Sequence, residues 1–242
     1  MILKTKNLYK KYNKKYIIKN ISLQLKQGEI VGLIGPNGAG KTTIFYTLIG
    51  LIHPEKGSLF LDTEDITNLP LYKRSRKGLG YLSQDPSIFR RLSVEDNILS
   101  ILEMHKKYFK NKKEITEKLL KELGIQKIRK NQGYSLSGGE RKKTEIARCL
   151  AINPKLILLD EPFSGIDPMT IEELQKIFIT LKKKNIGILI TDHNIKELFS
   201  ITDRMYLIYK GKILKEGTSK EVMKDPFVIK IYLGSYFKKW KI

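Results

Sequence analysis

The fold is decided by Gly35-Pro36-Asn37-Gly38-Ala39-Gly40-Lys41-Thr42-Thr43, which fits the phosphate-loop pattern G-x-x-x-x-G-K-[ST] in full. The segment 29–34 before it, apolar after its first residue, predicts a buried strand, and the segment 43–51 after it predicts a helix. A glycine-rich backbone can close its N–H groups around phosphate oxygens, and a helix start adds positive potential. Lys41 should then reach the β- and γ-phosphates, Thr42 should ligate Mg²⁺ through its hydroxyl, and the next threonine should contact phosphate. The stretch predicts a site for a nucleoside triphosphate.

Two acidic residues follow a second apolar run, 156–159, which is wholly apolar as in a strand covered on both faces of a parallel sheet. Asp160 ends this strand, at the edge where doubly wound sheets bind ligands, and its carboxylate is suited to hold Mg²⁺. Glu161 is the candidate general base that polarises an attacking water. The pair predicts hydrolysis of the bound triphosphate.

A second glycine-rich element, Leu136-Ser137-Gly138-Gly139-Glu140, precedes these acids. Ser137 and the amides of the two glycines open a predicted helix, 138–152, and form a second candidate anion site. Ser137 fits an ordinary N-cap as well, because a cap and a phosphate use the same free amides. One chain cannot easily aim both helix starts at the same phosphate.

Alternating strands and helices predict an α/β fold with a mostly parallel sheet. Strands at 2–7 and 17–25 predict an N-terminal antiparallel β region, and the helical, lysine-rich pattern from 93 to about 130 predicts an inserted helical subdomain. We expect one domain over 1–242. Within it, 1–85 and 155–242 form the nucleotide-binding core, and 86–154 forms the helical subdomain that carries the second glycine-rich element.

Composition narrows the class of protein. No apolar run approaches the roughly 18 residues that span a bilayer, and the start 1–6 lacks the apolar run of a secretory signal. A single cysteine, Cys149, agrees with a reducing cytoplasm. The net charge of +21 comes from lysines spread along the whole chain, which favours compositional bias, with attraction to anionic lipid headgroups as a secondary consequence. We expect no specific nucleic-acid partner.

The three elements together resemble those of the ATP-binding-cassette ATPases, and the resemblance covers essentially the whole chain. It implies ATP and Mg²⁺ as ligands and two copies that close head to tail, so that 136–140 of one copy completes the ATP site of the other. It also assigns roles to single positions. By this resemblance, Tyr12 is the aromatic that stacks on adenine, with Tyr9 and Tyr16 close by, and Gln84 is the glutamine that joins the metal site to the helical subdomain. The loop at the dimer interface is Ser164-Gly165-Ile166-Asp167. The histidine that senses the γ-phosphate is His193.

A narrower resemblance is to the ATPase subunits of bacterial lipopolysaccharide-export transporters. It rests on Phe45-Tyr46, on 78–94, on 190–194, and on Tyr232-Leu233-Gly234 with Phe237, whereas 238–242 departs from the pattern. It implies a dimer beneath two integral membrane subunits, peripheral on the cytoplasmic face of the inner membrane. Near the groove that receives a coupling helix it places Phe89, Arg90 and Arg91.

The sequence leaves two alternatives. One is the ATPase subunit of another transporter, such as a branched-chain amino-acid importer, because the catalytic residues do not separate the two. The other is a soluble cassette protein that acts on nucleic acid, suggested by the net charge of +21.

Overall fold

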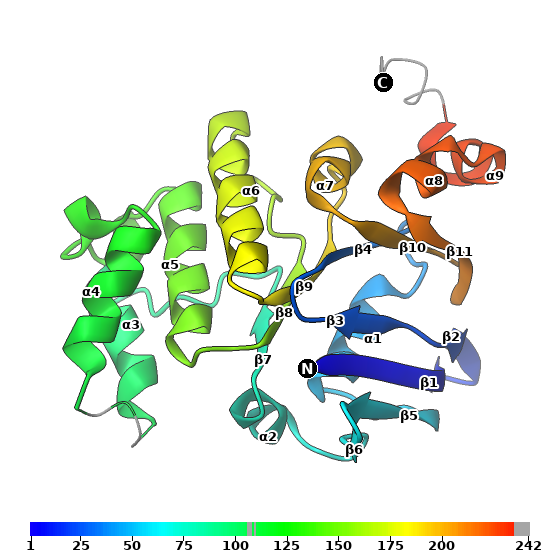
Figure 1. Ribbon diagram of the computed structural model, residues 1–242, viewed down its shortest axis with the longest axis horizontal. Helices are drawn as coiled ribbons and strands as arrows, with labels where there is room; N and C mark the ends of the chain where they lie inside the picture. The colour runs from blue at the N-terminus through cyan, green and yellow to red at the C-terminus, as the bar shows by residue number, and fades with distance from the viewer. Residues whose placement is uncertain (106–107, 109, 235–242) are drawn as a thin grey trace.

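Two β-sheets and a group of helices make up the fold (Figure 1). The computed structural model describes residues 1–105, 108 and 110–234, so the expectations for Phe237 and for 238–242 lie outside the described residues. No helix in this described part is long and apolar enough to cross a membrane.

The larger sheet carries the strand ends at which the candidate site lies. Its order is β11-β10-β4-β9-β8-β7, and every neighbouring pair is parallel except β10 with β11. This confirms the expected, mostly parallel sheet. The strands are β4 (Ile30–Ile34), β7 (Leu79–Leu82), β8 (Leu156–Asp160), β9 (Gly187–Thr191), β10 (Arg204–Tyr209) and β11 (Lys212–Thr218).

The second sheet is the antiparallel N-terminal region that the sequence predicts. It contains β1 (Ile2–Tyr12), β2 (Lys15–Ile21), β3 (Gln24–Lys26), β5 (Lys56–Leu61) and β6 (Glu64–Asp65). The strand expected over 17–25 is divided into β2 and β3. Thr5 causes the break, because its side-chain oxygen accepts a hydrogen bond from the amide of Leu23 at 2.8 Å and its hydroxyl donates to the Ile21 carbonyl at 3.2 Å.

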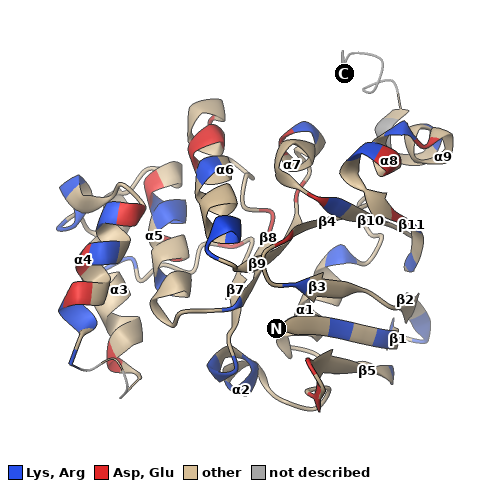
Figure 2. Cartoon of the chain, in the orientation of Figure 1, with Lys and Arg blue, Asp and Glu red and all other residues tan. Residues whose placement is uncertain are grey.

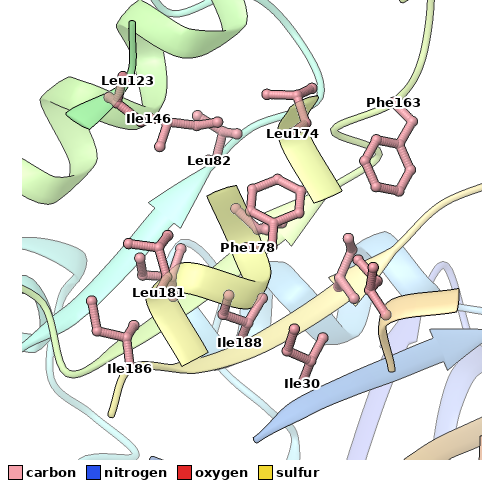
Figure 3. Packing of buried hydrophobic residues seen from close by; sticks show 14 of the residues in the cluster. Ile30, Leu82, Leu123, Ile146, Phe163, Leu174, Phe178, Leu181, Ile186 and Ile188 are labelled. Carbon is pink, nitrogen blue, oxygen red and sulfur yellow. The ribbon is translucent and has the colours of Figure 1, made fainter. Parts of the chain in front are cut away.

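Alternate residues of the buried strands enter two different cores. In β4, Ile30 and Ile34 face one core, whereas Val31 and Leu33 face the other. The first core lies under α6 (Pro168–Lys183), where Phe178 packs among side chains of the sheet and of the helical region (Figure 3). The second core joins the parallel sheet to the N-terminal sheet through α1 (Lys41–Ile49). Since α1 is packed between two sheets, the loop before it is held on a rigid support.

The remaining helices divide by position. Between β7 and β8 the chain forms α3 (Val94–Glu103), α4 (Lys112–Glu122) and α5 (Gly138–Ala151), which stand together at one end of the molecule (Figure 1). This matches an inserted helical region. Elsewhere lie α2 (Leu71–Arg76), α7 (Ile195–Ile201), α8 (Ser219–Lys224) and α9 (Pro226–Val228), followed by a π-helical turn over Ile229–Leu233.

Candidate functional site

The phosphate loop connects β4 to α1 in a conformation that needs glycine. Gly38 and Gly40 have φ of +73° and +108°, a region that side chains with a Cβ rarely adopt. Lys41 bends back over the loop, and its Nζ donates to the carbonyls of Gly35 at 2.7 Å and Pro36 at 3.2 Å. Burial lowers the pKa of Lys41, while Glu161 and Asp160 oppose that shift. The loop therefore presents one buried cation at the start of a helix, which suits a polyphosphate.

Two side chains contact the carboxylate of a third residue, and the three residues follow three neighbouring strands. Oε2 of Glu161 accepts a hydrogen bond from Nε2 of Gln84 at 2.8 Å, and its Oε1 lies 2.7 Å from Nε2 of His193. Glu161 follows β8, Gln84 lies after β7, and His193 lies after β9. The backbone of Glu161 is in the left-handed region, with φ of +49°, and its amide donates to the Thr191 carbonyl at 2.8 Å. A non-glycine residue held there indicates a functional constraint on the position of its side chain.

Asp160 lies next to this carboxylate, with only 1% of its surface exposed. Its Oδ1 is buried without a hydrogen-bond partner, as is Oγ1 of Thr191, the residue opposite it in the sheet. Burial, together with the nearby Glu161 charge, raises the pKa of Asp160 to about 6, against the opposing effect of Lys41.

An unpartnered oxygen of this kind fits a Mg²⁺ ion or one of its waters. Thr42, another predicted Mg²⁺ ligand, is half-buried in the first turn of α1. No group of three His, Cys, Asp or Glu side chains among the described residues could hold a metal alone.

One exposed aromatic ring stands at the end of β1. Tyr9 and Tyr16 pack edge to face, with ring centroids 6.0 Å apart, so each ring contacts the other. Tyr12 has 46% of its surface exposed, and the Lys10 ammonium lies 5.8 Å from its ring centre. Of the three tyrosines, Tyr12 has the ring that is most available to a flat base.

The second glycine-rich element caps α5. Ser137 Oγ accepts from the Glu140 amide at 3.3 Å, and the Glu140 carboxylate accepts from the Ser137 amide at 2.9 Å. Leu136 is buried and Gly138 is exposed. A Cβ on Gly139 would lie 2.5 Å from Cγ2 of Thr170, so α5 approaches α6 too closely for any side chain there. Figure 1 places α5 on the far side of α6 from the phosphate loop, so one chain does not bring the two elements together.

The loop between β8 and α6 is held at both ends. At its start, the Phe163 amide donates a hydrogen bond to Asp192 at 2.8 Å. Asp167 caps α6, accepting hydrogen bonds from the Thr170 amide at 2.9 Å and the Thr170 hydroxyl at 2.6 Å. Ser164 and Gly165 are exposed between these anchors, and Met169 has 79% of its surface exposed. The structure thus presents this predicted interface loop to the outside.

Sequence reasoning assigned no role to Asp192. It is 1% exposed, and its two oxygens accept from the amides of Phe163 at 2.8 Å and Asn194 at 2.9 Å. It therefore ties the loop after Glu161 to the segment that carries His193. Its place at a strand end, beside a histidine, was the signal that could have identified it. Thr170, whose methyl group leaves no room for a side chain at Gly139, had no such signal in the sequence.

The predicted coupling residues lie on a loop that Asn97 organises. The Asn97 side chain accepts from the Phe89 amide at 2.9 Å and donates to carbonyls of the same loop. The Arg148 guanidinium lies 4.4 Å from the Phe89 ring centre and also lines a groove of about 650 Å³. Phe89 thus contacts a side chain that lines the groove but does not line it itself. Arg90 and Arg91 are exposed and are not among the residues that line the groove.

Comparison with known proteins gives a consistent result. The ABC transporter family model matches residues 18–164. The chain is 47% identical to the lipopolysaccharide export system ATP-binding protein LptB of Acidithiobacillus ferridurans, over 98% of each chain. Identity to the protein of the same name from Haemophilus influenzae is 46%, over 98% of this chain and 99% of that one.

Solved structures agree with these relatives. A nucleotide-free ATP-binding cassette from an ABC transporter superposes with a TM-score of 0.86 at 29% identity, over 96% of this chain and 99% of that one. A dimeric cassette in a post-hydrolysis state, bound to ADP and phosphate, superposes with a TM-score of 0.80 at 26% identity, over 90% of this chain and 98% of that one. The chain belongs to the ABC transporter family, as one of its nucleotide-binding ATPase cassettes.

Proposed function

We propose that this chain is the ATP-hydrolysing subunit of a lipopolysaccharide-export transporter. In that role it works as a head-to-tail dimer beneath two integral membrane subunits, on the cytoplasmic face of the inner membrane. The assignment of lipopolysaccharide as the cargo rests on identity of 44–47%, over 98% of this chain, to proteins named for lipopolysaccharide export. Amino-acid import remains the first alternative, and none of these three relatives is named for it.

The nucleotide site divides into a base-binding and a phosphate-binding part. Tyr12 stacks on adenine through its exposed ring, while the amides of 35–43 and the Lys41 ammonium hold the phosphates. Thr42, Gln84 and Asp160 would hold Mg²⁺, and Gln84 also donates a hydrogen bond to Glu161. When bound, the ion neutralises charge on the β- and γ-phosphate oxygens.

Hydrolysis depends on the orientation of one carboxylate. Glu161 polarises the water that attacks the γ-phosphorus, and Gln84 and His193 fix the direction in which its oxygens point. His193 is half exposed, so it can also contact the γ-phosphate when ATP is bound. Asp192 positions His193 by accepting a hydrogen bond from the Asn194 amide, which follows the histidine in the chain.

A second copy completes the site. The amides of Gly138 and Gly139, with Ser137, contact the γ-phosphate bound by the partner, and Leu136 and Glu140 fix the start of their helix. The exposed loop of Ser164, Gly165 and Asp167 crosses the interface. ATP thus binds the closed dimer far better than the open one, as a ligand-driven switch requires.

Backbone contacts connect the loop that carries Phe89, beside the groove, to the segment before the second glycine-rich element. The Gly133 amide donates to the Leu92 carbonyl at 2.9 Å, and the Tyr134 amide donates to the Arg90 carbonyl at 2.9 Å. Gly133 and Tyr134 run directly into 136–140. A membrane-subunit helix in the groove beside Phe89 can therefore move the element that contacts ATP, with 86–154 moving as one helical subdomain against 1–85 and 155–242.

Co-purification tests this function. A tagged chain, extracted from its native membrane in mild detergent, should retain two integral membrane subunits, and lipopolysaccharide should change the ATPase rate of the complex. Phe89→Ala should lower the yield of membrane subunits, whereas Phe227→Ala, with a similar exposure of 50% against 46% for Phe89, should not. If the membrane subunits of an amino-acid importer co-purified instead, and their amino acid stimulated ATP hydrolysis, the cargo would be that amino acid and not lipopolysaccharide. Tight, steeply salt-dependent RNA or DNA binding would instead favour the nucleic-acid alternative.

A further inference from the structure

The turn between β10 and β11 contacts the phosphate loop. It consists of two residues, Lys210 and Gly211, because Tyr209 pairs with Lys212 in the hairpin. The Gly211 amide donates a hydrogen bond to the Ala39 carbonyl at 3.1 Å. The phosphate loop is therefore held from outside by a segment that lies far from it in the sequence.

This contact is made by backbone atoms alone. Gly211 is buried, with φ of +80°, and a Cβ on it would lie 2.2 Å from the carbonyl oxygen of Ile17 in β2. The Gly211 carbonyl accepts a hydrogen bond from the Lys19 amide at 2.8 Å. A Cβ on Gly40, in the phosphate loop, would lie 3.1 Å from the same Ile17 oxygen. Because β2, the turn and the loop pack this closely, a side chain at Gly211 would not fit, and the turn is a rigid support.

The hydrogen bond from Gly211 fixes the direction of one phosphate-loop amide. The peptide bond between Ala39 and Gly40 is trans, so its N–H points opposite to its C=O. Since the C=O is held by Gly211, the Gly40 N–H points away from the turn. Among the described residues nothing accepts a hydrogen bond from this N–H, which lies at the start of α1. Free amides at a helix start favour an anion.

We propose that Gly211 is a positioning residue for the bound phosphates: through the Ala39 carbonyl, its amide keeps the Gly40 N–H aimed at the polyphosphate. Apart from Lys41 at its first position, α1 carries no charged side chain (Figure 2), so backbone amides supply the remaining attraction for phosphate. A donor fixed in direction before the ligand arrives loses little freedom on binding. This role rests on the proposed function in one respect, because the phosphate loop is taken as the site of ATP. It needs neither a membrane subunit nor a cargo.

Calorimetric titration of the full-length chain tests the proposal with two ligands, ATP and inorganic tripolyphosphate, each with Mg²⁺. Gly211→Ala places a Cβ against the Ile17 oxygen, so the turn must shift and release the Ala39 carbonyl. We expect the Kd of both ligands to rise about tenfold, because one hydrogen bond to a charged oxygen is misdirected. The number of sites per chain should stay the same. A folding defect would instead lower that number and leave the Kd of the remaining sites unchanged.

A second variant moves the turn without adding a Cβ. One glycine inserted between Lys210 and Gly211 makes a three-residue turn, which β-hairpins also adopt, and displaces the Gly211 amide. It should weaken the binding of both ligands as Gly211→Ala does. The matched control is one glycine inserted between Asn13 and Lys14, a two-residue turn between β1 and β2 with φ of +44° and +67°. In the described part of the chain no hydrogen bond joins that turn to the phosphate loop, so the Kd of tripolyphosphate should not change.

Gly124→Ala controls for backbone strain, because Gly124 has φ of +65° but a Cβ there would meet no atom within 4 Å. It should leave the Kd of both ligands unchanged. Unchanged Kd values in both turn variants, or a fall in the number of sites alone, would overturn the proposal. So would weaker ATP binding with unchanged tripolyphosphate binding, which would mean that the turn acts on the Tyr12 ring through β2. Failure of the ATP site itself would look different, because the unaltered chain would then bind neither ligand.

Discussion

Nε2 of His193 lies 2.7 Å from Oε1 of Glu161, across the ends of two neighbouring parallel strands. Gln84 holds the other oxygen of that carboxylate at 2.8 Å. A carboxylate with a partner on each side is fixed in direction before any nucleotide arrives. Removing one partner therefore releases the base without removing it, which separates positioning from proton transfer.

His193→Ala should lower kcat for ATP hydrolysis about 100-fold, because a carboxylate free to turn is displaced from the attacking water. The KM for ATP should rise only modestly, since the phosphate loop is untouched and only the proposed contact of His193 with the γ-phosphate is lost. Steady-state kinetics of the purified chain measure both values. His53→Ala, an exposed histidine elsewhere, serves as the control and should behave as the unaltered chain. An unchanged kcat in His193→Ala would contradict the role of this contact.

Glu161→Gln should stop turnover while leaving ATP binding intact. The amide preserves size and most hydrogen bonding but cannot act as a base, so we expect hydrolysis to fall on the order of 10² to 10⁴-fold. ATP should then hold two copies together, and gel filtration with ATP and Mg²⁺ should show a stable dimer. Only monomer under these conditions, or near-normal hydrolysis, would count against Glu161 as the base.

Residue patterns alone predict the parts of the candidate site that are contiguous in the sequence, and not those that depend on tertiary proximity. Lys41 and the pair Asp160-Glu161 follow from local patterns, because a phosphate loop and a strand end each have a sequence signature. Gln84 bonds to a residue 77 positions away, and only resemblance could assign it. The contact between Asp192 and Phe163 is likewise set by strand order in the sheet.

The fold shows the same limit. A wholly apolar strand such as 156–159 is predicted as buried, but nothing in it tells which side chains enter which core. The break between β2 and β3 depends on the side chain of Thr5, a residue on another strand. Alternation of strands and helices was enough for the fold class, because it reflects the period of each element rather than its neighbours.

Asp160→Asn should stabilise the nucleotide-free chain, and the gain should depend on pH. The folded carboxyl keeps its proton up to a pKa of about 6, against 3.8 for an unperturbed group, so the folded state binds more protons between these values. The contribution of Asp160 to stability thus falls as pH rises through this window. We expect a gain of at most about 3 kcal/mol at pH 8, shrinking toward pH 4.

Thermal unfolding at several pH values measures this gain. Asp167→Asn is the control of opposite sign, because hydrogen bonds from Thr170 lower the pKa of Asp167 and so favour its ionised form in the folded chain. Its substitution should destabilise the protein at neutral pH and lose that effect as pH falls. A pH-independent gain in Asp160→Asn would refute the assigned cause.

Arg74→Met should destabilise the chain strongly, although it lies far from any reacting atom. The substitution leaves four backbone carbonyls without their donor, and hydrogen bonds to charged groups contribute about 1.5–3 kcal/mol each. Even with partial rehydration we expect a loss of at least about 3 kcal/mol, or a Tm lower by roughly 10 °C for a chain of this size. Arg76→Met, on the same helix but exposed, should change Tm by no more than about 2 °C. Similar losses in both variants would point to helix propensity instead.

Gly139→Ala tests whether close packing of α5 on α6 is needed for turnover. The added Cβ would lie 2.5 Å from Cγ2 of Thr170, so α5 must move away and its first amides must turn. We expect normal ATP binding by the monomer, measured with a fluorescent analogue, but loss of the ATP-dependent dimer and of hydrolysis. Gly138→Ala is the milder comparison, because its Cβ would lie 3.4 Å from Ile166. Adding Thr170→Ala to Gly139→Ala removes the clashing methyl and should restore part of the hydrolysis rate. If the double variant were as inactive as the single one, the glycine would be required for its contact with phosphate rather than for packing.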